Sequence, residues 1–206
     1  CSSDLKKVLM VATVAIFAFT NVNAQEVKFG VKAGVNVASI SGDDAENEEG
    51  RTSFHIGGVA EIMISENFSI QPELMYSSQG YSFASSETFG GNTYDYEETG
   101  KLDYINLPIM AKYYVAEGFS LEAGPQIGFL MSAKLESYDS EDGSYSDDIK
   151  ELLKDIDFGL GVGLGFKMDN GLNFAARYNI GLSSISEDDE YSIQNNVLQV
   201  SVGFMF

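Results

Sequence analysis

His55, the single histidine of the 206-residue chain, follows Ser53 by two residues. In a strand, residues two apart point to the same face, so the pair could begin a nucleophilic site for ester hydrolysis. Such a site also needs an acid that orients the imidazole and a donor for the oxyanion. Side chains two apart on one strand rarely bring an imidazole onto a hydroxyl. We therefore predict that the protein is not an enzyme.

The sequence has few residues that could bind a metal ion or a cofactor. A zinc site lacks a second histidine, and the only cysteine, Cys1, lies in the segment that we expect to be cleaved. The glycines at 159, 161, 163 and 165 recur every second residue, which continues a strand and does not open a helix as a phosphate-binding loop does. We expect no cofactor and no metal.

Charged residues occur inside apolar alternating segments, at the positions that face away from the apolar side chains. These residues are Lys32, Glu61, Glu73, Lys112, Glu122 and Arg177. The arrangement puts cations and carboxylates on one common face, where they can pair if the segments close around an interior. We expect them to form a structural charge network inside a barrel, without a catalytic role.

The elements that must carry these residues are strands in which apolar and polar side chains alternate. In the first, Val27, Phe29 and Val31 alternate with Lys28, Gly30 and Lys32. Such segments have about ten residues or more, close to the length of a tilted strand that crosses a bilayer. We place eight strands at about 27–40, 53–65, 68–82, 102–115, 119–135, 158–166, 172–180 and 198–206.

The connections alternate between short and long. Tight turns are predicted at 65–67, 116–118 and 169–171, and long polar loops at 41–52, 83–101, 136–156 and 183–196. Outer-membrane barrels have short periplasmic turns and long outer loops. We therefore predict an all-β fold over residues 25–206, an eight-stranded antiparallel transmembrane β-barrel of the up-and-down type. Both termini would be periplasmic, in the outer membrane of a Gram-negative bacterium. A soluble barrel is disfavoured because it would turn its apolar face inward.

The tight turns also indicate which inward residues face each other. Counting outward from 116–118 sets Lys112 opposite Glu122, and counting from 169–171 sets Arg177 opposite Gly163. We expect an ion pair between Lys112 and Glu122. We expect Arg177 to reach over the glycines toward Glu61 or Glu73. Such pairs would fill the interior, whereas in a wet interior each pair would contribute only about 0–1 kcal/mol.

Acidity is concentrated in the four predicted long loops, which together hold −17 of the formal charge of −19. Nucleic acid is disfavoured as a partner because phosphate binding needs a basic surface. Outer-membrane lipid is one expected partner, and lipopolysaccharide bridged by divalent cations or a basic surface protein are others. Alternatively, the charge only keeps the loops solvated. Within the third loop, a short helix at 148–155 would fold Leu152, Leu153 and Ile156 over the barrel mouth. The sequence specifies no oligomeric state.

Residues 1–24 have the features of an export signal. Lys6 and Lys7 precede an apolar run of twelve residues at 8–19, and Val22-Asn23-Ala24 forms a small-residue cleavage site. Twelve apolar residues are too few to span a bilayer as a helix, so we expect cleavage before Gln25. Residues 1–5 look foreign to the gene, and we expect them not to be native.

Three segments carry a resemblance to a known family: Tyr104–Tyr113 (YINLPIMAKY), Gly124–Gly128 (GPQIG) and Ala176–Leu182 (ARYNIGL). They resemble the recurring segments of the PorT-like outer-membrane β-barrel family of Bacteroidetes, a porin-type family named after a member linked to protein secretion. The resemblance covers the mature chain and implies a barrel in the outer membrane, without transferring a catalytic residue. We expect a barrel with a side-chain-filled lumen and a structural or surface-interaction role. A narrow channel or secretion accessory, and a lipid-modifying enzyme, stay open as alternatives.

Overall fold

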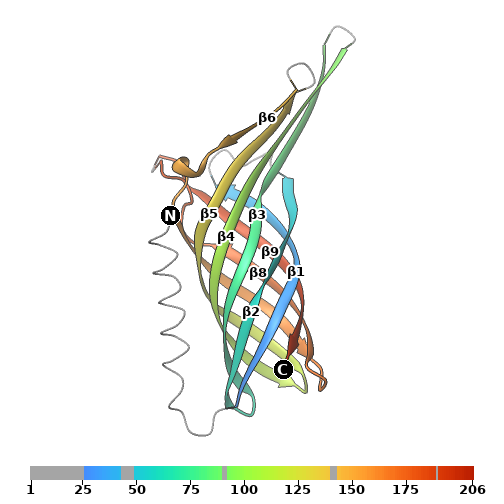
Figure 1. Cartoon of the computed structure of the whole chain (residues 1–206), viewed down its shortest axis with the longest axis vertical. Coiled ribbons are helices and arrows are strands. Elements are labelled where there is room, and N and C mark those ends of the chain that lie inside the picture. The colour runs from blue at the N-terminus through green and yellow to red at the C-terminus, as the bar shows by residue number, and fades with distance from the viewer. Residues whose placement is uncertain (1–25, 43–48, 90–91, 140–142, 189) are drawn as a thin grey trace.

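The computed structural model describes residues 26–42, 49–89, 92–139, 143–188 and 190–206. Regular structure within these ranges is almost entirely antiparallel β-sheet (Figure 1). The elements are β1 Val27–Gly42, β2 Glu49–Ser65, β3 Phe68–Phe89, β4 Asn92–Ala116, β5 Phe119–Asp139, β6 Gly143–Asp148, the 3₁₀ turn η1 Lys150–Leu152, β7 Ile156–Lys167, β8 Leu172–Gly181 and β9 Ile193–Met205.

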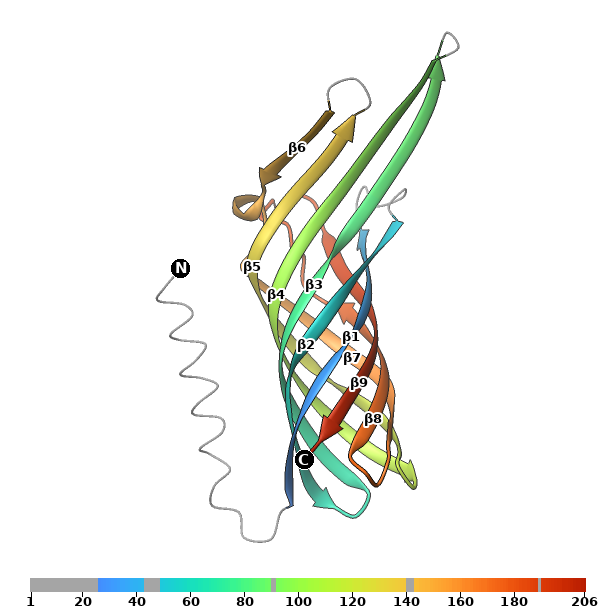
Figure 2. The same ribbon diagram turned by 45° about the vertical axis from the view of Figure 1, so that its right-hand side comes forward.

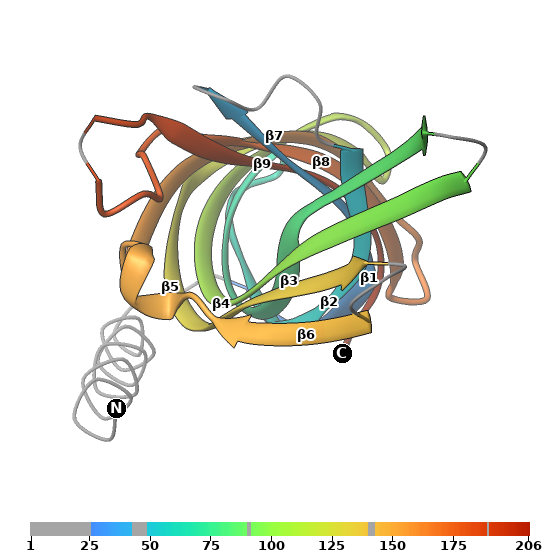
Figure 3. The same ribbon diagram turned by 90° about the horizontal axis from the view of Figure 1, so that it is seen from above.

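The sheet closes into a ring because β1 pairs with β2 on one side and with β9 on the other. The other pairs follow the chain from β2 to β5, and then β5 pairs with β7, β7 with β8 and β8 with β9. Seen from above, these strands surround a common interior (Figure 3). Counted over the described ranges, the ring has eight strands, which confirms the predicted up-and-down barrel.

The outer surface of the ring is apolar. In β9, Leu198, Val200 and Phe204 are 43–58% exposed, and they alternate with the buried polar residues Gln199 and Ser201. Outward-facing side chains on the other strands are 37–54% exposed: Val31, Val35, Phe54, Ile56, Leu74, Ile109, Leu121, Ile127, Phe158, Leu164 and Phe174. Aliphatic and aromatic side chains directed outward around a whole ring are the lipid-facing surface of a transmembrane barrel.

Short connections gather at one end of the barrel. Glu66 and Asn67 join β2 to β3, Glu117 and Gly118 join β4 to β5, and residues 168–171 join β7 to β8. Gly118 has a φ of +71°, a conformation that residues with a Cβ rarely adopt, and this allows the tight turn. β1 begins and β9 ends at this same end (Figure 1), which is the periplasmic end in outer-membrane barrels.

At the opposite end, β3 and β4 continue past the ring as a hairpin, and β5 and β6 extend the same sheet beside it (Figure 2). The prediction of loops at 83–101 and 136–156 is therefore wrong for most of their length. These segments alternate polar with aromatic residues, so they carry no membrane signal, yet their Tyr, Phe and Thr content suits strands. The extracellular blade denotes residues 81–89, 92–101, 133–139 and 143–148.

Apolar side chains close the interior below the blade. The buried cluster consists of Leu102, Tyr104, Leu130, Ala133 and Ile185, and Ile40, Ile149, Leu153 and Ile193 pack against it. Leu153 also forms an isolated backbone bridge with Ser186. Leu153 covers the barrel mouth as predicted, whereas Leu152 and Ile156 are 66% and 44% exposed. The predicted helix at 148–155 is reduced to the single turn η1.

The part of the chain that the structure describes contains no helix with the length and hydrophobicity of a membrane span. The His, Cys, Asp and Glu residues of these ranges form no group of three or more that could hold a metal ion. The predicted export signal at 1–24, with its doubtful first five residues, lies outside the described residues and stays a prediction.

Candidate functional site: the lumenal polar network

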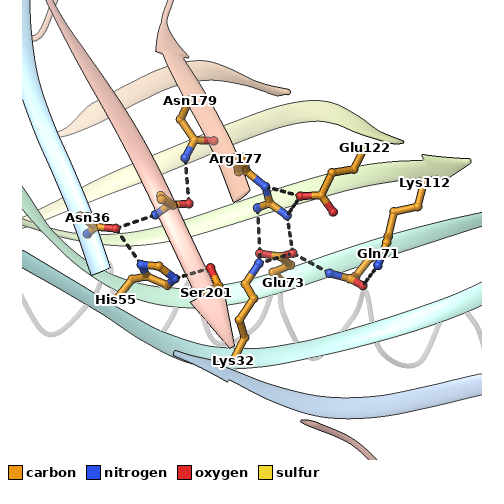
Figure 4. Close-up of polar contacts among 11 residues, drawn as sticks. Lys32, Asn36, His55, Gln71, Glu73, Lys112, Glu122, Arg177, Asn179 and Ser201 are labelled. Atoms are coloured by element: carbon orange, nitrogen blue, oxygen red, sulfur yellow. Dashed lines mark hydrogen bonds and ion pairs between the residues drawn. The ribbon is translucent and has the colours of Figure 1, made fainter. Parts of the chain in front are cut away.

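Four charged side chains meet in the middle of the barrel (Figure 4). Arg177 holds Glu73 at two points, with Nη1–Oε2 and Nη2–Oε1 distances of 3.0 and 2.8 Å. The Nε of Arg177 donates to Glu122 Oε1 at 2.9 Å. The Lys32 ammonium donates to both Glu73 oxygens, at 2.8 and 2.7 Å. All four residues are at most 5% exposed, and their formal charges cancel. We call them the central layer.

The central layer takes one residue from every second strand of the ring. Lys32 lies on β1, Glu73 on β3, Glu122 on β5 and Arg177 on β8. In a closed barrel of tilted strands, inward residues of alternate strands lie at one level. Strands β3 and β8 are four steps apart in both directions around the ring. The contact between Glu73 and Arg177 therefore crosses the lumen from one wall to the opposite wall.

Glycines of β7 leave the space through which Arg177 passes. Gly163 stands opposite Arg177, as the count from the turn predicts. A Cβ added to Gly161 would lie 3.2 Å from Arg177 Cδ and 2.8 Å from Asn179 Oδ1. Side chains on this strand would therefore compete with the arginine for room. The sequence offered Glu61 and Glu73 as acids within reach, and the guanidinium contacts Glu73 together with Glu122.

Glu61 of β2 organises a second layer nearer the short turns. Lys167 Nζ donates to its Oε2 at 2.6 Å, and Lys112 Nζ lies 3.7 Å from its Oε1. The hydroxyl of Ser69 donates to Oε1 at 3.0 Å, and the hydroxyl of Tyr114 forms a short hydrogen bond to the same oxygen. Glu61 is 1% exposed. We call this group the periplasmic layer, and it includes Lys167, which sequence reasoning did not single out.

The prediction of an ion pair between Lys112 and Glu122 is wrong. The two residues stand opposite each other in the sheet as expected. Yet the Lys112 ammonium donates to Gln71 Oε1 at 3.1 Å, while the Glu122 carboxylate accepts from Arg177. A guanidinium has five donors in a planar fork and takes acceptors on two sides, so it engages Glu122 as well as Glu73. Gln71 Nε2 also donates to Glu73 Oε1 at 2.7 Å, which joins the two layers.

His55 belongs to a third polar group on the extracellular side of the central layer. Its Nδ1 lies 2.7 Å from Asn36 Oδ1, and its Nε2 lies 2.8 Å from Ser201 Oγ. Ser53, the serine suggested by the sequence, instead donates to a backbone carbonyl at 2.6 Å. Both His55 and Ser201 are register partners of Gly34. A Cβ at Gly34 would lie 2.7 Å from His55 Cε1, so this glycine allows the imidazole to bridge across β1.

Serine, histidine and asparagine in a hydrogen-bonded row have the order of a nucleophile, a base and an orienting group. Asn36, His55 and Ser201 are at most 6% exposed. Asn36 is held further, because Gln199 Nε2 donates to its Oδ1 at 3.0 Å. The row joins β9, β1 and β2, and all three side chains are packed among these strands.

A vestibule of about 820 Å³ opens at the end with the short turns. Lys28 and Met205 line its wall, and Tyr114 and Lys167 also contribute to its lining. Because Tyr114 and Lys167 contact Glu61, the vestibule reaches the periplasmic layer. The periplasmic layer lies at the inner end of the vestibule, and the apolar cluster around Tyr104 lies toward the opposite end of the barrel.

A closed strand ring with a lipid-facing outer surface and a polar interior defines an integral membrane β-barrel. The family described as "Outer membrane protein beta-barrel domain" matches residues 23–187, so the chain belongs to that family. No curated protein sequence matches the chain closely enough to serve as a relative. The protein is an integral barrel of the outer membrane of a Gram-negative bacterium.

Solved structures of similar fold have low sequence identity. Ail, the attachment invasion locus protein of Yersinia pestis, is 13% identical, with 88% of this chain and 99% of that chain covered and a TM-score of 0.52. A second structure of Ail, in complex with the heparin analogue sucrose octasulfate, is 15% identical over the same shares, with a TM-score of 0.51. Neisserial surface protein A is 12% identical, again over 88% and 99%, with a TM-score of 0.50. At these identities the likeness shows the shared barrel fold.

Proposed function

We propose that this barrel is a closed membrane anchor that holds an acidic extracellular surface for interaction with a partner. The central layer is the observation that supports a closed anchor. Its four side chains come from alternate strands and form ion pairs with one another across the lumen. The periplasmic layer and the apolar cluster add two further obstructions in series. Free diffusion of solutes through an eight-stranded barrel filled in this way is not expected.

The extracellular charge supports the second half of the proposal. The segments 41–52, 83–101, 136–156 and 183–196 hold −17 of the formal charge, and much of 83–101 and 136–156 is folded as sheet rather than as loops. We propose a basic surface protein as the partner, or lipopolysaccharide through bridging divalent cations. Ail was solved with a heparin analogue, but this acidic surface disfavours a polyanion here. We also propose membership of the PorT-like branch, on the strength of segments 104–113, 124–128 and 176–182.

Single-channel recording of the refolded protein in a planar bilayer tests the closed lumen. We expect no stable conductance from the unaltered protein. The double variant Arg177→Ala with Glu73→Ala removes the contact between opposite walls and should increase ion leakage. Stable steps in the nanosiemens range from the unaltered protein would overturn the closed anchor and favour the narrow channel.

One observation favours a second candidate, the lipid-modifying enzyme. Ser201, His55 and Asn36 form the hydrogen-bonded row that nucleophilic hydrolases use. Their burial opposes it, because a lipid ester would have to enter the barrel past tightly packed strands. We therefore place the lipid-modifying enzyme second. Labelling of Ser201 by a covalent serine probe separates it from the closed anchor.

A further inference from the structure

One face of the extracellular blade gathers aromatic side chains around a carboxylate. Phe83, Glu98, Ser137 and Tyr145 are successive register partners on β3, β4, β5 and β6. Residues directly opposite each other on neighbouring strands point to the same side of a sheet. This row therefore marks a single face that crosses four strands, which we call the inner face of the blade. Tyr81 and Tyr96 lie two residues from Phe83 and Glu98 and share it.

The Glu98 carboxylate is held by phenols. The hydroxyl of Tyr96 donates to Oε2 at 2.8 Å, and that of Tyr81 approaches Oε1 at 3.4 Å. The hydrogen bond to Glu98 raises the pKa of Tyr96, so its hydroxyl stays protonated and remains a donor. The Phe83 and Tyr96 rings stand edge to face with centroids 6.2 Å apart, and Tyr145 is 52% exposed.

The two faces of the blade differ in whether basic side chains accompany their acidic side chains. On the outer face, Lys101 forms an ion pair with Glu136 at 2.5 Å. The inner face has no Lys or Arg at the positions that point to the same side as Glu98, which are 81, 83, 85, 96, 98, 100, 135, 137, 143, 145 and 147. Among these described residues, Glu98 and Asp147 are the charged ones. The inner face thus combines negative charge with aromatic rings and provides no cation of its own.

We propose that Tyr81, Phe83, Tyr96, Glu98 and Tyr145 form a cage that takes the side-chain cation of a Lys or Arg from a basic protein segment. Ring faces attract cations, and the carboxylate adds a charge-assisted hydrogen bond. A bare divalent cation would need several oxygen ligands, and this face offers mainly ring carbon. The inference deepens the proposed surface interaction and rests on it, since it names where and how the partner is held.

A peptide titration tests the cage on the full chain, refolded in detergent micelles. The probe is an end-capped hexa-arginine peptide, and isothermal titration calorimetry measures its dissociation constant. Glu98→Gln should weaken binding about tenfold, and Tyr96→Leu about three- to tenfold. Glu97→Gln is the matched control, because it removes the same charge from the neighbouring residue on the outer face, and we expect less than about a twofold change.

The outcomes separate the cage from the proposed function. Equal weakening by Glu97→Gln and Glu98→Gln, or full affinity in Tyr96→Leu, would show diffuse attraction to acidic segments and overturn the cage while leaving the surface role intact. Absence of binding by the unaltered protein would overturn the cage together with the basic-protein partner, and would leave lipopolysaccharide as the proposed partner of the acidic surface. Each variant is first shown to be folded by its gel mobility before heating. Phe83→Leu, which conserves bulk and removes the ring, repeats the test if Tyr96→Leu does not fold.

Discussion

Arg177 and Glu73 are joined by two hydrogen bonds across the width of the barrel, although 104 residues separate them in the chain. Their strands do not pair in the sheet, so the contact holds together walls that the hydrogen-bond ladder links only around the circumference. Lys32 contacts the same carboxylate, and Glu122 the same guanidinium. The arrangement makes Glu73 the common acceptor of two buried cations.

Glu73→Gln should therefore be among the most destabilising conservative changes in the protein. It would leave Lys32 with a neutral acceptor and Arg177 with Glu122 as its remaining carboxylate partner in the central layer, and stranding a buried charge costs roughly 3–5 kcal/mol. Urea unfolding from lipid vesicles measures the loss. Lys101→Met serves as the control, because its pair with Glu136 is more than one-third exposed and should contribute only about 0–1 kcal/mol. Similar small losses in both variants would indicate a water-filled lumen.

Gly34→Ala should be destabilising because a Cβ there would clash with the Val200 carbonyl oxygen and lie 2.7 Å from His55 Cε1. Forcing extra volume into a packed site costs about 1–3 kcal/mol. Gly58→Ala is the matched change on the outer face, where the nearest atom is 3.9 Å away. We expect it to be neutral or slightly stabilising. Thermal or urea unfolding of the pair checks the difference, and equal stabilities would contradict the close packing around the imidazole.

The adjacent leucines 152 and 153 should differ in their effect on the barrel mouth. Leu153 packs against the buried apolar cluster, whereas Leu152 is 66% exposed. Leu153→Ala should loosen the segment and speed hydrogen exchange of the Lys154 amide, which donates to the Ile185 carbonyl at 2.8 Å. Leu152→Ala should leave that exchange unchanged. Equally faster exchange in both variants would contradict a specific role of Leu153 in holding the mouth.

Ser201 should not react with a fluorophosphonate probe that labels activated serines. Its hydroxyl lies 2.8 Å from His55 Nε2 but is enclosed with it among packed strands. Mass spectrometry of the folded protein after incubation gives the readout. Labelling of Ser201 that disappears in His55→Ala would support the lipid-modifying enzyme in place of the closed anchor. Boiled protein supplies the background, since it has lost the hydrogen-bonded row.

The membrane-facing part of the fold could be predicted because lipid imposes a strict period of two on every strand. Tight turns also fixed the register beside them, which is why Lys112 and Glu122, and Arg177 and Gly163, were paired correctly. The blade escaped prediction because strands in water carry polar residues on both faces. The hydrogen-bonded row of Asn36, His55 and Ser201 escaped prediction because β1 and β9 are joined by no turn. Without a turn to count from, Ser201 could not be placed beside His55.

The prediction of ion-pair partners from the sequence was also limited by the length of lysine and arginine side chains. Lys112 was assigned the residue opposite it on the paired strand, but its long side chain reaches Gln71, a diagonal neighbour on β3. For Arg177 the sequence offered both Glu61 and Glu73, and the guanidinium contacts Glu73 on the far wall. Deciding among such partners needs the level of each residue along the tilted barrel, which depends on the closure of all eight strands.

The central layer also sets the order of events as the barrel assembles. Glu73 and Lys32 enter with the early strands, whereas their arginine partner arrives with β8, after most of the chain has been delivered. Until then the inward carboxylates need water, so an unfinished sheet stays hydrated on the side that later becomes the interior. Completion of the ring brings Arg177 to both carboxylates and neutralises the charges together. Once closed, the barrel can reopen only by separating opposite walls and returning these ions to water.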